Sequence, residues 1–590
     1  MKTPILSSSR RLGFLAVLTL LVGAASPALA KTLHVPAEHA TIQAAVNAAA
    51  AGDTVLVAAG TYRERIRLKE NVTLQSAGDD TRGKLGLARA EATIIDGGGK
   101  QGAGAGVAMA EGAVLDGFTV TNVGVYDDAE WTRHHATYGN EQAHEHIGQP
   151  GVAGVGVVAV NCTIQNNIVH RIGYTGIAIT GAEGRRCSPR VVRNVCYRNM
   201  GGGIGSMRGS TALIEENVCF QNFYAGIGHE GASPLVLRNV CYENIRAGIG
   251  ISEGARPIVR GNQCYRNRRA GIGIRTGADT SPVIEDNDCY RNDMAGIGCE
   301  EESTPLIRNN RCYENTRAGI GSRDRARPVI VGNQCYRNQA AGIGSEAGSR
   351  PLIANNECYE NASAGIGQQG DTETVLIGNY VHHNLATGLG FAGTEKGRAE
   401  VLNNRIVDNA NVAIGIQSGW KVRLVGNELS RDGGMPPIVM VFKGAEAEFT
   451  DNTIRGSGVA GIRTEGVVRA MRNRFECPAL REGGGPPQFA VWGLPGADIV
   501  FTGNTVRGWR NALAADKATV TARNNRIAHY GTVGIKLDQP VGKAVITGNV
   551  FESDRDKTGF TVSGGEAVVE DNRVERGKEA KPAGEKKEKP

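Results

Sequence analysis

The chain has 590 residues, 82 of them glycine, and a formal net charge of +6 at neutral pH. High glycine content without a G-X-Y period excludes a collagen-like chain, and an apolar share of 41% is too high for a disordered one. No basic patch with interleaved aromatic residues indicates nucleic-acid binding. After the first thirty residues, no stretch is long and apolar enough to predict a membrane span.

Residues 1–30 have the pattern of a signal peptide. Arg10 and Arg11 give a positive start, and an apolar run follows from Phe14 to Val22. Ala28, Leu29 and Ala30 fit the small-x-small rule for cleavage. We therefore expect an exported protein, which is periplasmic, secreted or located at the cell surface.

Residues 31–53 are predicted to form an N-terminal cap that contains one short helix. Ile42, Ala45, Val46 and Ala49 fall on one face of that helix. An exposed final coil of a repeat protein needs such a cover.

Residues 123–150 interrupt a rhythm of short apolar patches that starts at Thr54, and they form a predicted inserted loop. The insertion is rich in groups suited to acid–base chemistry or to a divalent metal, the one cofactor that the sequence suggests. The catalytic candidates are Asp127, Asp128, His134, His135, His144 and His146. The four histidines are also the metal-ligand candidates, and Tyr138 is a candidate for substrate binding. The alternative is a polar surface loop in which the histidines have no function.

Residues 191–384 repeat with a period of about 23 residues. Each repeat holds three short apolar patches, centred in one case on Val259, Cys264 and Ile272, and no helical stripe. This pattern predicts three short strands per coil, stacked in register as an all-β, right-handed parallel β-helix over residues 54–576, with roughly 18 coils. Residues 577–590 are predicted to be a disordered Lys/Glu/Pro tail.

The repeated Ala-Gly-Ile-Gly strand raises a functional hypothesis. If isoleucine points inward, the flanking glycines point outward and form a flat strip without side chains. The substrate-binding candidates on this strip are Gly226, Gly228, Gly271 and Gly273. The alternative is that glycine serves a tight bend or packing against the chain's own loops.

Two further columns of side chains, one of cysteines and one of aromatic residues, recur in successive repeats. Eight of the nine cysteines between Cys196 and Cys358, all except Cys299, recur at one inward position, where core packing, disulfides and soft-metal binding are the alternatives. The aromatic residues that follow them form an outward ladder, which either stacks on itself or binds sugars.

The segment 41–57, followed by Gly60, Thr61, Tyr62, Arg63 and Glu64, resembles the start of pectate-lyase-like β-helix proteins. This resemblance implies the pectin lyase fold with a capping helix. The superfamily includes polysaccharide lyases, polygalacturonases, pectin methylesterases and alginate epimerases. The polygalacturonase motifs Asn-Thr-Asp, Gly-His-Gly and Arg-Ile-Lys are absent from this sequence, and so is the Asp-Pro-His motif of the alginate epimerases. No catalytic residue is therefore carried over, because a fold alone does not assign a function.

These features favour a protein that binds an extended polysaccharide along the glycine-paved face. Whether it also processes the polysaccharide is left open. As an enzyme, the protein would be a polysaccharide lyase, hydrolase or epimerase. Two alternatives remain: a non-enzymatic envelope or surface scaffold, which the near-uniform repeats favour, and a periplasmic metal-handling protein that uses the histidine-rich loop.

Overall fold

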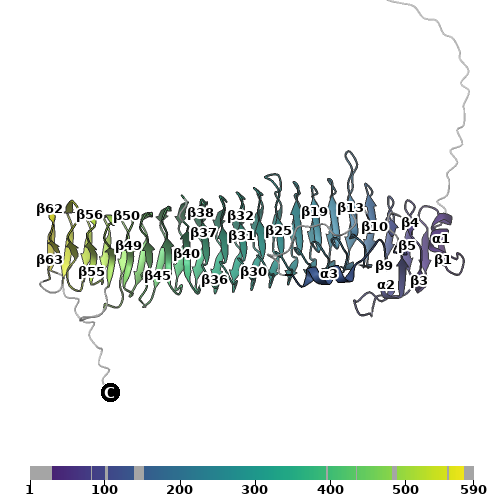
Figure 1. Cartoon of the computed structure of the whole chain (residues 1–590), viewed down its shortest axis with the longest axis horizontal. Helices are drawn as coiled ribbons and strands as arrows, with labels where there is room; N and C mark the ends of the chain where they lie inside the picture. The colour runs from purple at the N-terminus through teal and green to yellow at the C-terminus, as the bar shows by residue number, and fades with distance from the viewer. Residues whose placement is uncertain are drawn as a thin grey trace, which may run out of the picture.

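The computed structural model describes residues 29–81, 83–99, 104–137, 152–393, 396–433, 435–480, 488–553 and 557–576. Through these residues the chain winds as one long rod of stacked coils (Figure 1). The predicted tail and all of the predicted signal segment except Leu29 and Ala30 lie outside the described residues. No described helix is long and apolar enough to cross a membrane.

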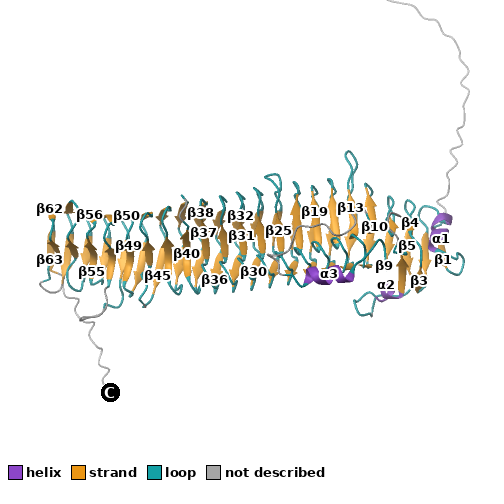
Figure 2. Ribbon diagram, viewed as in Figure 1, coloured by secondary structure: helices purple, strands orange, loops and turns teal. Residues whose placement is uncertain are grey.

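Three parallel sheets run the length of the rod, and almost all of its regular structure is strand (Figure 2). Sheet A extends from β1 (Thr32–Val35) to β62 (Glu566–Glu570), sheet B from β3 (Gly60–Tyr62) to β63 (Arg573–Arg576), and sheet C from β4 (Ile66–Arg67) to β61 (Phe560–Ser563). Every coil except the first and the last contributes one strand to each sheet, as in β23 (Ile258–Arg260), β24 (Gln263–Tyr265) and β25 (Ile272–Ile274).

The apolar patches of each repeat point into the rod. Val259, Cys264 and Ile272 are fully buried and pair in register with Ile284, Cys289 and Ile297 of the next coil. The predicted three-stranded parallel coil is therefore confirmed. Sheet A has 22 strands, so the expected number of roughly 18 coils is too low. The missed coils lie where spacing varies, as between Asn473 and Asn504, which hydrogen-bond in adjacent coils although 31 residues apart.

Two buried asparagine ladders close the turns of the coils. Asn310, for example, donates from Nδ2 to Oδ1 of Asn333 at 2.9 Å and to the carbonyl of Ile284 at 3.0 Å. Its own Oδ1 accepts from both the backbone N and the Nδ2 of Asn287. Each asparagine thus satisfies buried polar groups in two neighbouring coils, which fixes the register of the stack.

Eight successive strands of sheet B, from β15 (Val195–Tyr197) to β36 (Glu357–Tyr359), carry cysteine inward and an aromatic residue outward. All twelve cysteines are buried and free, and burial raises the pKa of the Cys289 thiol well above its usual value. Outside, Tyr290 and Tyr313 stack with ring centroids 4.9 Å apart and an interplanar angle of 4°. Because the faces of these rings cover one another, the ladder presents ring edges to solvent. It stacks on itself, as one of the two interpretations expected.

Helices lie only at the N-terminal part of the described rod (Figure 2). Helix α1 (Ile42–Ala48) packs against β1, β2 and β4 and buries Ile42, Ala45 and Val46. Its N-cap is Thr41, whose side chain accepts from the backbone N of Ala44. The helix covers the first coil of the solenoid.

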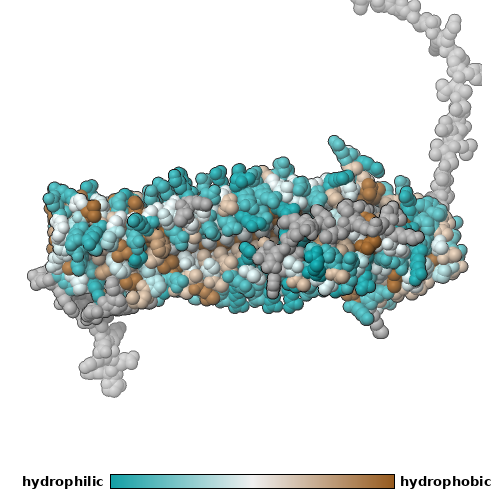
Figure 3. All heavy atoms as spheres, viewed as in Figure 1, coloured by the Kyte–Doolittle hydropathy of each residue, from teal (hydrophilic) through white to brown (hydrophobic). Residues whose placement is uncertain are grey.

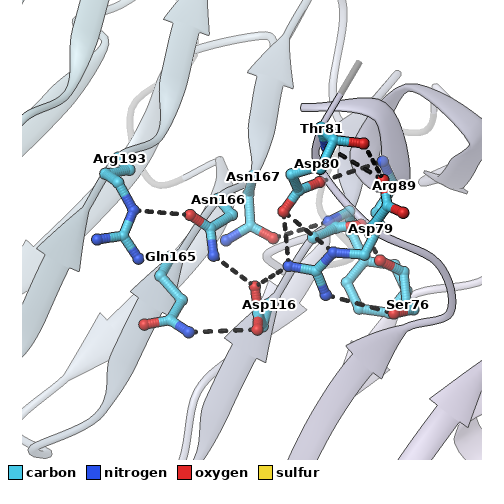
Figure 4. Close-up of polar contacts among 12 residues, drawn as sticks. Ser76, Asp79, Asp80, Thr81, Arg89, Asp116, Gln165, Asn166, Asn167 and Arg193 are labelled. Atoms are coloured by element: carbon cyan, nitrogen blue, oxygen red, sulfur yellow. Dashed lines mark hydrogen bonds and ion pairs between the residues drawn. The ribbon is translucent and has the colours of Figure 1, made fainter. Parts of the chain in front are cut away.

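Helix α2 (Ala88–Ala92) is fastened to the rod by a buried arginine. Arg89 lies between two carboxylates and forms ion pairs of 2.8 Å with both Asp80 and Asp116 (Figure 4). Asp116 also accepts from Nδ2 of Asn166 at 2.8 Å, so the network reaches the next coil. This paired and hydrogen-bonded arrangement has a structural role, because it satisfies a guanidinium that is only 7% exposed.

Candidate functional site: a groove along sheet C

The outer face of sheet C carries a strip of glycines over many consecutive coils. On β25 the outward residue between Ile272 and Ile274 is Gly273, and it pairs with Gly250 and Gly298 of the adjacent strands β22 (Ile249–Ser252) and β28 (Ile297–Cys299). This glycine strip comprises Gly205, Gly228, Gly250, Gly273, Gly298, Gly321, Gly344, Gly367, Gly390 and Gly415.

The strip glycines are not required by the backbone. A Cβ atom at Gly228 would meet nothing within 4 Å, and at Gly273 it would meet only the Cβ of Ala247 at 3.7 Å. Neither residue has a positive φ. Side chains would therefore fit at these positions, and strand propensity favours them over glycine.

The other glycine of each pair has a different role. A Cβ atom at Gly226 would lie 2.8 Å from the carbonyl oxygen of Gly248, and one at Gly271 would lie 2.7 Å from that of Gly296. Both residues are buried in the turn before the strand. The expectation that Gly226 and Gly271 face outward is thus wrong, because this turn packs against the next coil. The outward surface consists of the second glycines, with Gly228 and Gly273 among them.

Six glycines of the strip, from Gly298 to Gly415, form the floor of a groove of about 660 Å³ that runs over sheet C between Met294 and Phe442. The candidates Gly228 and Gly273 lie on the strip but do not line this groove. Ala295, Ala318, Ala341 and Ala364 line it beside the glycines. Polar side chains form its borders: Glu300, Arg317, Arg323, Glu346, Gln369 and Gln417. In the space-filling view, hydrophilic residues dominate the two long borders of the rod, and paler and hydrophobic residues lie between them (Figure 3).

Ion pairs between coils order part of this border. Arg323 lies 3.0 Å from Glu300 of the preceding coil, and this hydrogen bond raises the pKa of the arginine. Both side chains keep contact with solvent, 45% for Arg323 and 28% for Glu300, so their remaining donors and acceptors can bind a polar ligand in the groove.

Part of the predicted inserted loop forms a helix, α3 (Asp128–His135). Asp127 is its N-cap and accepts from the backbone N of Glu130 at 3.0 Å. Asp128 forms an ion pair of 3.1 Å with Arg198 and accepts from the hydroxyl of Tyr126. These two catalytic candidates therefore start the helix and attach it to the solenoid.

His134 and His135, the two described histidines of the insertion, contact other residues of α3 or the solenoid beneath it. Nε2 of His134 lies 3.1 Å from Oε1 of Glu130, and its ring packs edge-on against Phe223. Arg133, and then His134, hold the pKa of Glu130 down at about 2. His135 stacks on Trp131, and burial lowers its pKa.

Helix α3 docks through an apolar cluster on the turn that precedes sheet C. Trp131 packs with Met200, Phe223 and Ile245, one residue from each of three successive coils. Its Nε1 donates to the carbonyl of Gln221 at 2.8 Å, and the guanidinium of Arg198 lies 4.4 Å from the ring centroid. Helix α3 thus packs on coils that precede those of the groove, and no described residue of α3 lines the groove.

The remaining candidates of the insertion, Tyr138, His144 and His146, lie outside the described residues. Among residues that the structure describes, no group of three or more histidine, cysteine or acidic side chains is arranged to hold a metal ion. The roles assigned to these histidines and carboxylates stay predictions.

Sequence reasoning missed the alanines beside the strip and the end of the groove near Phe442. A usable signal was present, because the outward column of sheet C changes from Gly415 to Met440 in register.

Comparison with known proteins agrees with this architecture. The profile of the right handed beta helix region matches residues 151–283, 236–366, 273–429, 346–473 and 437–582. The chain therefore belongs to the right-handed parallel β-helix proteins, with the pectate-lyase-like fold that its N-terminal segment resembles. No curated protein matches the chain.

Several solved structures share low similarity with the chain. A periplasmic alginate epimerase is 14% identical with a TM-score of 0.32, over 46% of this chain and 78% of its own. The catalytic unit of a GH87 alpha-1,3-glucanase from Streptomyces thermodiastaticus is 14% identical with a TM-score of 0.37, over 55% and 61%. A pectate lyase is 14% identical with a TM-score of 0.25, over 46% and 69%.

Proposed function

We propose that this protein is exported and binds an extended polysaccharide in the groove over the glycine strip. The observation that carries the proposal is the contrast between the two glycine columns. Glycine before the strand is enforced by packing, whereas glycine on the strip is not. Glycine weakens a strand, so its uninterrupted use on the strip calls for another reason, and close approach of a ligand to the backbone is one.

The dimensions and chemistry of the groove favour a linear, polar ligand. From Gly298 to Gly415 the floor of the groove measures about 24 Å at roughly 4.8 Å per coil. The borders offer charged and amide groups, such as Arg317, Glu346 and Gln417, which can donate to and accept from hydroxyl groups. A flat floor with polar borders suits a sugar chain better than a compact ligand, which would occupy only a small part of the groove.

The scaffold alternative explains the uniform repeats but gives no reason for strand-weakening glycines on only one outer face. The metal-handling alternative lacks support from the described residues, since His134 and His135 contact Glu130, Phe223 and Trp131. The proposal concerns binding, because the sequence lacks the catalytic motifs of the polygalacturonases and of the alginate epimerases.

The test is a binding screen with immobilised alginate, polygalacturonate, α-1,3-glucan and β-1,4-glucan. The mature chain should bind at least one of them, and a Gly321→Val/Gly344→Val variant should lose at least ten-fold in affinity because the valines raise the floor. Ala354→Val is the matched control, because Ala354 lies on the outer face of sheet A. Binding to none of the four, or equal binding by the floor variant, would contradict the proposal. Export is tested by cell fractionation.

A further inference from the structure

The groove has an end. In register with the glycine strip, Gly415 pairs with Met440 on β46 (Val439–Val441), then come Arg463 on β49 (Ala460–Thr464) and Trp492 on β52 (Phe489–Gly493). The floor without side chains therefore gives way to three large side chains in successive coils. In the opposite direction the strip continues from Gly205 to Ala178, so the floor stays low there.

The side chains beyond the end are held in place. The guanidinium of Arg463 lies 5.7 Å from the ring centroid of Trp492, and it also forms an ion pair of 3.1 Å with Glu465. Trp492 packs edge-on against Phe489 with centroids 5.6 Å apart. Because these contacts restrain Arg463 and Trp492, a ligand would have to displace paired groups to continue along the floor.

An exposed aromatic ring stands at this end. Phe442 lines the groove beside Met440 and is 37% exposed. Among the large hydrophobic residues that are exposed in the described chain, it is the only phenylalanine or tryptophan. The tyrosines of the sheet B ladder cannot replace it, because their ring faces cover one another. An exposed aromatic face is a platform on which the C–H face of a pyranose ring stacks.

We infer that the groove binds the end of a polysaccharide chain, with the terminal sugar ring against Phe442 and Met440 and the rest of the chain over the glycine strip toward Gly298. This inference rests on the proposed function and adds a selection for chain ends. The polar side chains of Gln417, Gln369 and Arg323 line the groove beside the path of the polysaccharide. The step in the floor after Gly415 excludes the interior of a longer chain from the last position.

Stoichiometry distinguishes end binding from internal binding. We would titrate size-fractionated chains of each polysaccharide that the wild type retains in the screen above, and measure the number of protein molecules per chain by analytical ultracentrifugation. End binding predicts one protein per chain at every length, and a molar affinity that stops rising once the chain is longer than the groove. Internal binding predicts a number of proteins that rises with length, which would overturn the inference while the proposed function stands.

Two variants probe the end directly. Phe442→Ala should lower the affinity for short chains about 2- to 10-fold, whereas Phe442→Trp should restore it. Met435→Ala is the control, because Met435 is 63% exposed and does not line the groove. Met440→Gly/Arg463→Gly should lower the step and let long chains bind more than one protein. An unchanged affinity of Phe442→Ala with wild-type melting would also overturn the inference. If no polysaccharide binds the wild type, the proposed function fails, and this inference fails with it.

Discussion

Gly319 and Gly321 flank the same inward residue, Ile320, yet a Cβ atom would clash at the first and fit at the second. At Gly319 it would lie 2.7 Å from the carbonyl oxygen of Gly342 and 2.8 Å from Nδ2 of Asn338. At Gly321 its nearest neighbour would be the Cβ of Ala295 at 3.8 Å. One glycine serves the fold, and the other leaves the surface of sheet C flat.

This difference predicts opposite effects of the same substitution. Gly319→Ala should lower the free energy of unfolding by about 1–3 kcal/mol, because the methyl group overpacks a closed turn. Gly321→Ala should be neutral or raise it by about 0.4–1 kcal/mol, since alanine loses less backbone entropy on folding. Chemical denaturation of both variants measures the two changes. If Gly321→Ala were as harmful as Gly319→Ala, the glycine strip would be a requirement of the fold.

A substitution in the asparagine ladder should lower the melting temperature far more than a substitution on the surface. Asn310→Ala removes the acceptor of two Asn287 donors and a donor to Asn333 and Ile284, all of them buried. Each unsatisfied buried group costs about 1–3 kcal/mol, so the melting temperature should fall by many degrees. Gln339→Ala, an exposed change in the adjacent coil, is the control and should leave melting unchanged. Equal melting of both variants would refute the structural role of the ladder.

The solenoid was predictable because each coil repeats the same physical demands. Ile272, Cys264 and Val259 face inward, and Asn262 and Asn267 recur at fixed spacing, so the period of the sequence fixes the period of the fold. The orientation of Gly271 was not predictable from alternation alone, because the turn before β25 places this residue outside the regular strand and against Gly296.

The site was less predictable than the fold. The clustering of His134 and His135 with Asp127 and Asp128 indicated chemistry, but in the described chain these residues cap helix α3, pair with its neighbours or stack on Trp131. Density of polar residues does not distinguish a docking helix from a reactive site. The groove depends on which residues of distant coils meet on one face, and that information appears only once the coils are in register.

Helix α3 should detach from the rod without unfolding it. His134 is only 5% exposed and packs against Phe223, so His134→Ala should weaken the docking of residues 128–135. Trp131→Ala should have a stronger effect, because it also removes the hydrogen bond to Gln221. Hydrogen exchange should rise in this segment, while the solenoid keeps its melting temperature because each coil is held by its neighbours. Arg133→Ala is the control, since its side chain is 61% exposed. A lower melting temperature of the whole rod would contradict this prediction.

A buried histidine should make the stability of the rod depend on pH. His229 points into the interior on β19 (Ile227–Glu230), is 1% exposed, and has no hydrogen-bond partner for either ring nitrogen within the described chain. Burial lowers its pKa to about 3 from the usual 6.5. The neutral ring is therefore favoured in the folded state, and protonation favours unfolding. Above about pH 6.5 the ring is neutral in both states, and its titration does not reduce the free energy of unfolding. As the pH falls from 6.5 toward 3, protonation of His229 in the unfolded state lowers that free energy progressively.

Substitution by the residue of the neighbouring coil isolates this effect. His229 pairs in register with Ile251, so His229→Ile places a side chain that the same interior column already accommodates. The variant should melt at or above the wild-type temperature at pH 7, because an unpartnered polar ring is replaced by an apolar group. Between pH 6.5 and 4 it should lose less stability than the wild type, by up to a few kcal/mol. His34→Gln, at an exposed position, should follow the wild-type curve. Parallel melting curves for His229→Ile and the wild type across this range would show that His229 does not titrate with unfolding.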